Sequence, residues 1–546
     1  HRSFTANRWP LFFLLIPMFI YGLVGCGSSP PGNESGPQTF EEMMKLFRHP
    51  PAEYRTAPLW VWNDDMTEKQ ILEQLTDFND KGIGGVFVHP RPGLITPYLS
   101  KRWHALFSYA TQVAKKLEMH VWIYDENSYP SGFAGGHVPA EMPESWNQGQ
   151  GLNMIHQDTL KLDPDLSYEV VLIQQEGAFK NITGDHMDHL GKAGDYYLFV
   201  KVYYQPSAWH GGYTYVDLLV PGVAEKFIDI TMKGYEATSA EDFGSTVAGV
   251  FTDEPNINAP GQIRWTPDLF EEFSRRWKYD LRQHLPSLLM ETGDFRKVRY
   301  HYYALLLDLF IERWSLPWYD YTRKNDLKWT GHYWEHGWPD PSEGPDNMAM
   351  YAWHQVPGID ILMNQYRETV NAQFGNARAV KEVRSVANQM GRRRTLSETY
   401  GAGGWDLTFE DMKRIADWQY VLGINFLNQH LSYVTIKGAR KRDHPQSFSY
   451  HEPWWKHYRV LADYCARLSV ALSSGEQKNS ILVLEPTTTA WMYYAPGNLN
   501  KKFGVLASGF QDLINTLEEN QVEYDLGSEA IINRFGSVED GLLTVG

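Results

Sequence analysis

Short apolar runs alternate with amphipathic helical segments from residue 57 to residue 435. The first run is followed by a helical segment that opens with capping-box spacing at Thr67 and Gln70. Strands that alternate with helices in this way are typical of a parallel sheet. Eight such runs predict an α/β fold in which a (β/α)8 TIM barrel closes on itself. The runs are residues 57–63, 84–90, 120–126, 247–252, 327–335, 359–364, 395–398 and 424–430.

The alternation is interrupted between the third and the fourth run. Residues 140–245 contain segments, among them 196–204 and 216–220, whose apolar pattern is typical of strands. We therefore predict one barrel domain over residues 41–475 that carries a β-rich insertion at about 140–245. Since the insertion follows a strand, it should emerge at the mouth of the barrel.

A second α/β pattern starts after the barrel. Apolar segments at 480–484 and 522–526 flank a helical segment at 510–520. We expect residues 476–546 to be the beginning of a further α/β domain that the sequence cuts short.

The first residues have the layout of an export signal. Two arginines precede an apolar run at residues 9–24, which is short for a membrane-spanning helix. The run ends in Leu-Val-Gly-Cys at Cys26, which resembles the lipobox of bacterial lipoproteins, and a stretch rich in Gly, Ser and Pro follows. We expect residues 1–25 to be a signal peptide and residues 26–40 a flexible tether.

A lipid on Cys26 would anchor the exported protein to the bacterial cell envelope, so the membrane is an expected partner. Gly27 after the cysteine favours the outer membrane or the periplasm as the destination. The chain has two cysteines. Lipidation would leave Cys465 without an intrachain disulfide partner, so stability must come from core packing.

Composition and missing motifs exclude several classes of partner and cofactor. The formal net charge is −16 and no broad basic stripe is present, which argues against nucleic acid as a partner. The sequence contains no HExxH, CxxC, P-loop or GxSxG pattern, and the glycines at 132–136 lack dinucleotide-binding spacing. We expect no organic cofactor.

Carboxylates and imidazoles recur where the predicted strands end, and this is where a (β/α)8 barrel keeps its active site. A buried carboxylate is costly unless it is paired, so such a ring exceeds what a structural role requires. Glycoside hydrolysis needs two carboxyl groups beside the bond, one as general acid and the other as base or nucleophile. The ring consists of His89, Asp125, Glu126, Asp253, Glu254, Glu335, His336, Glu398 and His430.

Glu254 and Glu398 are the candidates for the catalytic pair because they end the fourth and seventh strands, on opposite parts of the mouth. Aromatic side chains near these ends offer flat apolar faces that suit sugar rings. We therefore expect an oligo- or polysaccharide substrate, contacted by the other members of the ring and by Trp62, Tyr124 and Trp405.

The segments WVWN at 60–63, PSGFAGG at 130–136, GVFTDEP at 249–255 and SETYGAGGW at 397–405 resemble glycoside hydrolase family 106, the α-L-rhamnosidases. The resemblance extends from about residue 55 to residue 500. It implies a barrel enzyme that removes terminal rhamnose from plant or microbial glycans with inversion of configuration. It also implies a calcium ion near the sugar, without indicating the ligands.

Carried over from the resemblance, Glu254 is the general acid and Glu398 the general base that activates water. Glu335 is the alternative for either role. An inverting enzyme needs its two carboxyl groups roughly 6.5–9.5 Å apart and an acid with a raised pKa. We expect Glu335 to raise the pKa of Glu254, since Asp253 on the same strand should point the other way.

Two other functions stay open on the sequence. A retaining barrel glycosidase acting on another sugar, such as galactose, would place its two carboxyl groups only about 5–5.5 Å apart. A non-catalytic glycan-binding lipoprotein would keep the pocket without the chemistry, but the presence of both Glu254 and Glu398 argues against it.

Overall fold

The computed structural model describes residues 36–497 and 500–546. The predicted signal peptide at residues 1–25, the predicted lipidation site Cys26 and most of the predicted tether lie outside the described residues. Within the described ranges, no helix combines the length and the apolar character needed to cross a membrane.

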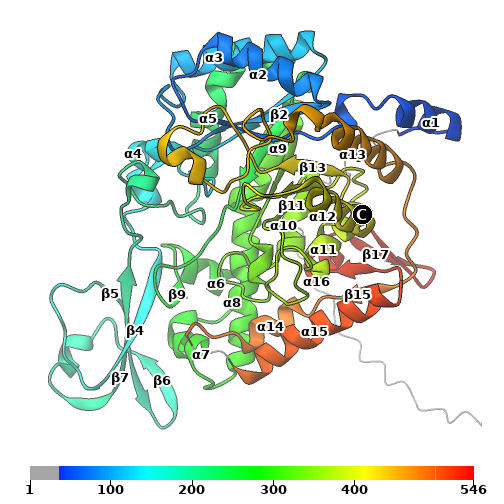
Figure 1. Cartoon of the computed structure of the whole chain (residues 1–546). Coiled ribbons are helices and arrows are strands. Elements are labelled where there is room, and N and C mark those ends of the chain that lie inside the picture. The colour runs from blue at the N-terminus through cyan, green and yellow to red at the C-terminus, as the bar shows by residue number, and fades with distance from the viewer. Residues whose placement is uncertain (1–35, 498–499) are drawn as a thin grey trace, which may run out of the picture.

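Eight parallel strands form a barrel at the centre of the molecule (Figure 1). A further two-residue strand, β14 (Ser432–Tyr433), follows the eighth strand along the chain and pairs with β1, so the sheet closes. The predicted fold class is confirmed. The barrel strands are, in their order around the sheet, β1 Leu59–Trp62, β2 Gly85–Pro90, β3 His120–Tyr124, β8 Val247–Asp253, β10 Lys328–His332, β11 Val356–Ile361, β12 Leu396–Thr399 and β13 Phe426–Gln429.

Helices cover the outside of the barrel, and local sequence signals set their ends. Thr67 caps α2 in a reciprocal capping box with Gln70, and Gly423 ends α12 with a φ of 115°, a conformation that favours glycine. The helices up to residue 475 are α1 Phe40–Arg48, α2 Glu68–Asp80, α3 Lys101–Lys116, α4 His137–Glu141, α5 Val223–Ser239, α6 Leu269–Trp277, α7 Leu285–Leu289, α8 Phe295–Phe310, α9 Leu316–Lys324, α10 Asn347–Tyr351, α11 Ala377–Gln389, α12 Phe409–Leu422 and α13 Arg459–Leu472.

Side chains of the strands alternate between the barrel interior and the layer beneath the helices. On β1, Val61 joins the cluster inside the barrel, whereas Trp60 and Trp62 join the cluster under the helices. Trp62 packs against Trp103 of α3, with ring centroids 4.9 Å apart. The expectation that Trp62 contacts a sugar is therefore wrong, because its place in the strand directs it away from the mouth.

A five-stranded antiparallel sheet projects from the barrel at the lower left of Figure 1. Its edge strand β9 follows barrel strand β8 and pairs with β4 through Arg264 and Gly151. Because β9 comes after the carboxyl end of a barrel strand, the sheet is attached on the mouth side. Its strands are β4 Gly151–Thr159, β5 Tyr168–Gln175, β6 Ala178–Asn181, β7 Ala193–Val202 and β9 Ile263–Arg264.

The predicted end of the insertion at residue 245 is wrong. Residues 223–239 form helix α5, whose buried side chains include Phe227, Thr231 and Tyr235 at a spacing of four. This helical period was present in the sequence and outweighs the strand-like residues around it. Tyr235 receives a hydrogen bond from the indole of Trp103 on α3 at 2.8 Å, so α5 belongs to the helical layer of the barrel.

The C-terminal segment packs directly against the barrel. Strands β15 (Leu482–Leu484) and β16 (Asp525–Gly527) form a parallel pair. The Leu526 amide donates to Ser385 of α11, and Phe510 lies 5.5 Å from Trp338 by ring centroids. Apolar side chains of this segment join the cluster beneath the barrel helices. Its other elements are α14 Thr487–Tyr493, α15 Lys501–Glu519, α16 Glu529–Phe535, β17 Gly536–Glu539 and β18 Leu542–Val545.

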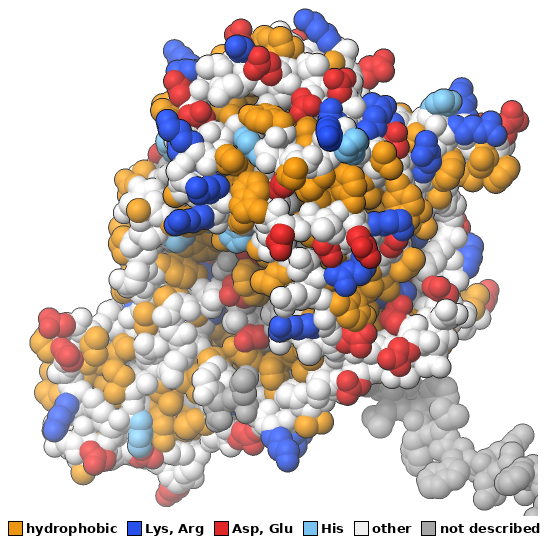
Figure 2. All heavy atoms as spheres, viewed as in Figure 1, with side chains coloured by type: hydrophobic (Ala, Val, Ile, Leu, Met, Phe, Trp, Pro, Cys, Tyr) orange, Lys and Arg blue, Asp and Glu red, His pale blue; other side chains and the backbone are white. Residues whose placement is uncertain are grey.

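The face seen in Figure 2 has acidic and basic side chains interspersed among hydrophobic ones. Neither sign of charge gathers in one region of this face.

Candidate active site

Four ionisable side chains meet at the carboxyl ends of neighbouring strands. Asp253 ends β8, His332 ends β10, Asp360 lies in β11 and Glu398 in β12. The strand register pairs His332 with Asp253 and Asp360 with Glu398, and the ligand atoms of Asp253, His332 and Glu398 lie within 4.8 Å of one another. Each is at most 6% exposed. Carboxylates buried this deeply need partners to stabilise their charge.

Gly331 allows strands β10 and β8 to approach closely at this end of the barrel. Its φ is 130°, and a Cβ there would lie 1.8 Å from the carbonyl oxygen of Thr252. Any other residue would push the two strands apart. The glycine therefore helps to hold His332 beside Asp253.

His332 lies between two carboxylates. Its Nε2 is 3.0 Å from Glu398 Oε2 and 3.6 Å from Asp253 Oδ1. The hydroxyl of Tyr124 donates to the other oxygen of Asp253. On the far side of Glu398, Nε2 of His430 lies 3.6 Å from Oε1. Glu398 thus has an imidazole beside each carboxylate oxygen.

The surroundings of Glu398 favour its ionised form. Burial raises its pKa, but His430 and His332 outweigh burial and lower the pKa below its usual value. The pKa of His430 is itself lowered to about 4, mainly by burial, so this ring is neutral near pH 7. Burial also acts to lower the pKa of His332, yet its hydrogen bond to Glu398 and the charge of Asp253 raise it well above the usual value. We therefore attribute the ionisation of Glu398 to His332.

The surroundings of Glu254, which directly follows β8, favour its protonated form. Burial raises its pKa well above the usual value, and the charge of Asp253 adds to the effect. The hydrogen bonds that Glu254 makes within the described chain involve its backbone N–H and C=O, so its carboxyl group has no partner there. The residue is partly exposed. A carboxyl group that keeps its proton and reaches solvent can donate it to a bound ligand.

Backbone strain marks the same end of the barrel. Glu254, Met363 and Tyr400 have φ values of 46°, 66° and 75°, in the left-handed region that residues other than glycine rarely adopt. Each lies within two residues of the end of a barrel strand. Conformations of this kind concentrate at functional sites, where the surrounding structure enforces them.

The left-handed turn at Glu254 also corrects an expectation about its neighbours. Strand alternation should have directed Asp253 away from Glu254 and left Glu335 as the main charge that raises the pKa of Glu254. The turn ends the alternation at this point. The charge of Asp253 contributes more to the raised pKa than the charge of Glu335 does, so that expectation is wrong.

The predicted substrate contacts at Asp125 and Glu126 are wrong, because neither residue is exposed and the loop that follows β3 hydrogen-bonds to both carboxylates. Glu126 is 0% exposed and accepts five backbone N–H groups at 2.6–3.2 Å. Asp125 accepts from the hydroxyl of Ser131 at 2.6 Å, and that hydroxyl accepts from the Asp253 amide at 2.8 Å. The donors to Glu126 are Asn127, Gly132, Phe133, Ala134 and Gly135.

Glu335 is buried and already engaged, so the structure removes it as an alternative acid or base. Its carboxylate accepts from the hydroxyl of Tyr351 at 3.0 Å and from the amide of Asp360 at 2.5 Å. The ring nitrogens of His336 face two backbone carbonyl oxygens, one of them that of Asp360 at 2.6 Å. Both residues hold the loop after β10 against β11, and the expected substrate contact of His336 is wrong.

His89 and Tyr124 support the site from beneath, because neither side chain is exposed. Their ring centroids lie 3.5 Å apart, and His89 Nε2 lies 3.0 Å from a guanidinium nitrogen of Arg91. Arg91 in turn makes two 2.7 Å hydrogen bonds with Asp443, which tie the loop after β14 to β2. The prediction that His89 and Tyr124 contact the substrate is therefore wrong. Both residues support the site instead, and Tyr124 does so by its hydrogen bond to Asp253.

Trp405 keeps an open face at the mouth. It follows β12, its indole N–H donates to the carbonyl of Lys441 at 3.1 Å, and it is 37% exposed. Of the other predicted contacts, Asp253 and His430 belong to the network around Glu398.

The sequence prediction misses His332 and Asp360, although a signal for both was present. Trp329 of β10 and Ile359 of β11 belong to the cluster beneath the helices. Strand alternation then turns His332 and Asp360 into the barrel. Burial raises the pKa of Asp360 well above its usual value, and its Oδ1 has no hydrogen-bond partner among the described residues.

Asp253, His332 and Glu398 form the one group among the described residues whose donor atoms lie near enough to share a metal, within 4.8 Å of one another. Calcium takes six to eight oxygen ligands, whereas imidazole suits transition metals. Two carboxylates and one imidazole, already hydrogen-bonded to each other, do not fit the expected calcium ion. No step of the chemistry below uses a metal.

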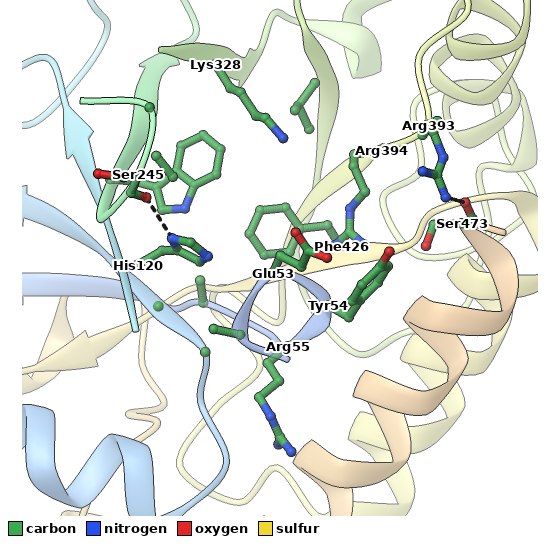
Figure 3. A pocket seen from close by; sticks show the side chains of 18 of the residues that line it. Glu53, Tyr54, Arg55, His120, Ser245, Lys328, Arg393, Arg394, Phe426 and Ser473 are labelled. Carbon is green, nitrogen blue, oxygen red and sulfur yellow. Dashed lines mark hydrogen bonds between the residues drawn. The ribbon is translucent and has the colours of Figure 1, made fainter. Parts of the chain in front are cut away.

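A cavity of about 300 Å³ lies at the opposite end of the barrel (Figure 3). Its lining includes Lys328, Glu53 and Tyr54, and His120 there lies 3.1 Å from the carbonyl of Ser245. These residues precede or begin the barrel strands, whereas barrel enzymes carry out their chemistry at the carboxyl ends. We therefore assign the candidate active site to the mouth.

A family model described as alpha-L-rhamnosidase, glycoside hydrolase family 106, matches residues 202–490, which is more than half of the chain. The matched range includes Glu254, His332 and Glu398. No curated protein sequence matches the chain.

Solved structures similar to this chain are barrel glycosidases. A rhamnosidase from Novosphingobium sp. PP1Y has a TM-score of 0.66 at 16% identity, over 92% of this chain and 66% of that chain. A beta-galactosidase from Halorubrum lacusprofundi has a TM-score of 0.53 at 10% identity, over 87% and 66%. A GH42 beta-galactosidase mutant from G. stearothermophilus has a TM-score of 0.50 at 10% identity, over 87% and 67%. At these identities the likeness establishes the fold. This chain spans about 66% of the length of the solved rhamnosidase.

Proposed function

Because the chain belongs to the alpha-L-rhamnosidase family of glycoside hydrolases, we propose that it hydrolyses terminal α-L-rhamnosides of plant or microbial glycans with inversion of configuration. The observation that carries the proposal is that Glu254 and Glu398 lie in surroundings with opposite effects on a carboxyl pKa. The pKa of Glu254 is raised and that of Glu398 is lowered by their surroundings. Two carboxyl groups with pKa values pushed apart are the pattern of an acid and a base.

In the proposed reaction, Glu254 donates its proton to the glycosidic oxygen. The bond from that oxygen to the anomeric carbon breaks, and its electrons leave with the protonated oxygen. Glu398 takes a proton from a water molecule, whose oxygen attacks the anomeric carbon from the opposite face. The sugar is released with inverted configuration, and proton exchange with solvent restores both side chains.

Two neighbouring residues support this division of roles. His332 donates a hydrogen bond to Glu398 and keeps it ionised, so that it can accept the proton of water. Asp253 disfavours a second negative charge on Glu254. The mouth thus keeps one carboxyl protonated and the other ionised at the same pH.

Hydrolysis of 4-nitrophenyl glycosides tests the proposal. We expect the α-L-rhamnoside to be cleaved and the β-galactoside not to be. Proton NMR of the first product should show the β-anomer before mutarotation, which is the inverted configuration. Release of the α-anomer would instead support a retaining mechanism. Binding of rhamnosides without cleavage would support the non-catalytic alternative.

A structure with bound rhamnose provides a second test of inversion. We expect the carboxyl groups of Glu254 and Glu398 to lie roughly 6.5–9.5 Å apart, which leaves room for the attacking water. A separation of about 5–5.5 Å would favour a retaining enzyme.

We further propose that the protein is exported and anchored to the cell envelope by a lipid on Cys26, on the basis of the lipobox and the tether in the sequence. Mass spectrometry of the native N-terminus should find acylated Cys26 as the first residue. A free thiol there, or retention of residues 1–25, would refute the assignment.

A further inference from the structure

Exposed tryptophans concentrate at the mouth of the barrel. Among the described residues, three tryptophans are more than a third exposed, namely Trp209, Trp334 and Trp405. Trp334 follows β10 and Trp405 follows β12, whereas Trp209 comes from the segment that returns from the projecting sheet to the barrel. The function proposed above gives Trp209 no role. A tryptophan ring held open at a barrel mouth offers a flat apolar face on which the ring of a ligand can stack.

Trp209 is attached to the loop that follows β3. Its indole N–H donates to the carbonyl of Tyr129, and the two rings meet edge to face with centroids 5.3 Å apart. The indole is thus held in one orientation while it remains 40% exposed. A ring fixed in advance loses little conformational freedom when a ligand stacks on it.

The turn that carries Trp209 is itself docked on this loop. Gly211 has a φ of 67°, and a Cβ there would lie 2.3 Å from the carbonyl oxygen of Gly135. The ring of His210 meets Phe133 edge to face at 5.0 Å. Both contacts fall on the loop whose amides are bound by Glu126. The buried Glu126 therefore organises the surface on which Trp209 rests.

Tyr129 locates this pair of rings beside the acid of the proposed reaction. Ser131, two residues after Tyr129, donates its backbone N–H to the carbonyl oxygen of Asp253 at 2.7 Å, and its hydroxyl accepts from the Asp253 amide at 2.8 Å, so this loop is bonded to the residue that precedes Glu254. The guanidinium of Arg91 lies 5.6 Å from the centre of the Tyr129 ring. Trp209 and Tyr129 thus border the Glu254 side of the mouth, while Trp405 lies after the strand of Glu398.

In the proposed reaction, the leaving group and the attacking water occupy opposite sides of the mouth. The acid protonates the oxygen of the leaving group, so the leaving group must lie beside Glu254. The water activated by Glu398 approaches from the opposite face. We propose that Trp209 and Tyr129 form a subsite for the leaving group, which receives the apolar face of the ring that carries the rhamnosyl unit. This inference rests on the proposed function.

The subsite is tested with three α-L-rhamnosides that differ in leaving group: methyl, 4-nitrophenyl and a second sugar. We expect Trp209→Ala to raise KM by roughly tenfold for the two ring-bearing substrates, because the stacked ring is lost. The kcat/KM of the methyl rhamnoside and inhibition by free rhamnose should change by less than about twofold. If only one of the two ring-bearing substrates responds, the subsite takes that ring and not the other.

Two variants serve as controls. Trp209→Phe keeps an aromatic face and should restore most of the preference for ring-bearing substrates over the methyl rhamnoside. Phe40→Ala removes an exposed ring on α1, far along the chain from the site, and should leave that preference unchanged. An equal loss on all three substrates would mean that Trp209 only stabilises the loop, and no loss on any would mean that nothing stacks there. Either result overturns the subsite while the proposed function stands. If the unmodified protein cleaves none of the three rhamnosides, the proposed function fails and the subsite fails with it.

Discussion

The pair Asp-Glu occurs twice at the end of a barrel strand, and the two glutamates differ in hydrogen bonding and in exposure, although burial raises the pKa of both. Asp125-Glu126 follows β3 and Asp253-Glu254 ends β8, and these strands are hydrogen-bonded neighbours. Glu126 accepts five backbone N–H groups and is sealed from solvent. Glu254 has no partner for its carboxyl group within the described chain and remains partly exposed.

The difference shows that a carboxylate at the mouth of a barrel is not in itself a sign of catalysis. Backbone donors engage both carboxylate oxygens of Glu126 and the residue is sealed from solvent, so it is not placed to exchange a proton with a bound ligand. Glu254 is left free, and its backbone is held in a strained left-handed turn. A proton donor is to be expected where the fold leaves a carboxyl group without a hydrogen-bond partner and within reach of solvent, as at Glu254.

The largest expected effect follows replacement of the base. Glu398→Gln removes the group that we propose activates water, and water activation is needed whatever the leaving group. We expect kcat to fall by roughly 10⁴ or more on both activated and natural rhamnosides, near the upper end for loss of a general base. Steady-state kinetics on both substrates provide the measurement. Retention of activity on either substrate would remove Glu398 from the mechanism.

Replacement of the acid should have an effect that depends on the leaving group. Glu254→Gln removes the proposed proton donor at almost constant shape, and we expect kcat to fall by about 10²–10⁴ on poor leaving groups. Nitrophenyl rhamnosides need less protonation and should lose much less. A series of aryl rhamnosides of graded leaving-group pKa measures the effect. An equal loss across the series would contradict the role of acid.

Replacement of Glu126, the buried counterpart of Glu254, should lower the stability of the fold and not the rate of the reaction. Glu126→Gln places an amide N–H2 against backbone N–H groups and leaves at least two of them without an acceptor. We expect the free energy of unfolding to fall by about 2–4 kcal/mol, from the cost of buried unsatisfied donors. Chemical denaturation measures this loss. The kcat of the folded protein should change by less than about tenfold, and a catalytic loss as large as that of Glu254→Gln would break the comparison.

A smaller effect should appear in the pH dependence of His332→Gln. Glutamine can still donate a hydrogen bond to Glu398 but carries no positive charge, so the pKa of Glu398 should rise. Activity requires ionised Glu398, so the acidic limb of kcat/KM should move to higher pH, by about one unit. His104→Gln provides a control, because it replaces a buried histidine of α3 whose pKa is lowered mainly by burial. An unmoved acidic limb in His332→Gln would refute the role of His332.

The fold could be predicted from the sequence because its signals are local. Capping at Thr67, the αL glycine at 423 and the eight apolar runs each depend on residues that are close in the chain. The error at residues 223–239 came from extending the β-rich insertion to residue 245, across a segment whose apolar spacing was helical. The position of the projecting sheet depends on the pairing of β9 with β4, more than a hundred residues apart.

The candidate site was predictable only in part for the same reason. Glu254, Glu398 and His430 follow from their places at strand ends. The roles of Glu126 and Glu335 depend on backbone amides and on Asp360 and Tyr351, whose positions are set by tertiary structure. Alternation along β1 does distinguish Trp62 from Val61, and along β10 it turns His332 inward, so these two errors could have been avoided from sequence.

The pH–rate profile of Glu254→Gln tests most directly the claim that Glu254 is protonated and Glu398 ionised in the active protein. With an activated aryl rhamnoside, kcat/KM of the unmodified protein should rise with pH as Glu398 ionises and fall again at higher pH as Glu254 loses its proton. In Glu254→Gln the fall at high pH should disappear, while the rise at low pH stays in place. Survival of the fall at high pH, or a shift of the rise at low pH instead, would contradict the assignment of acid and base.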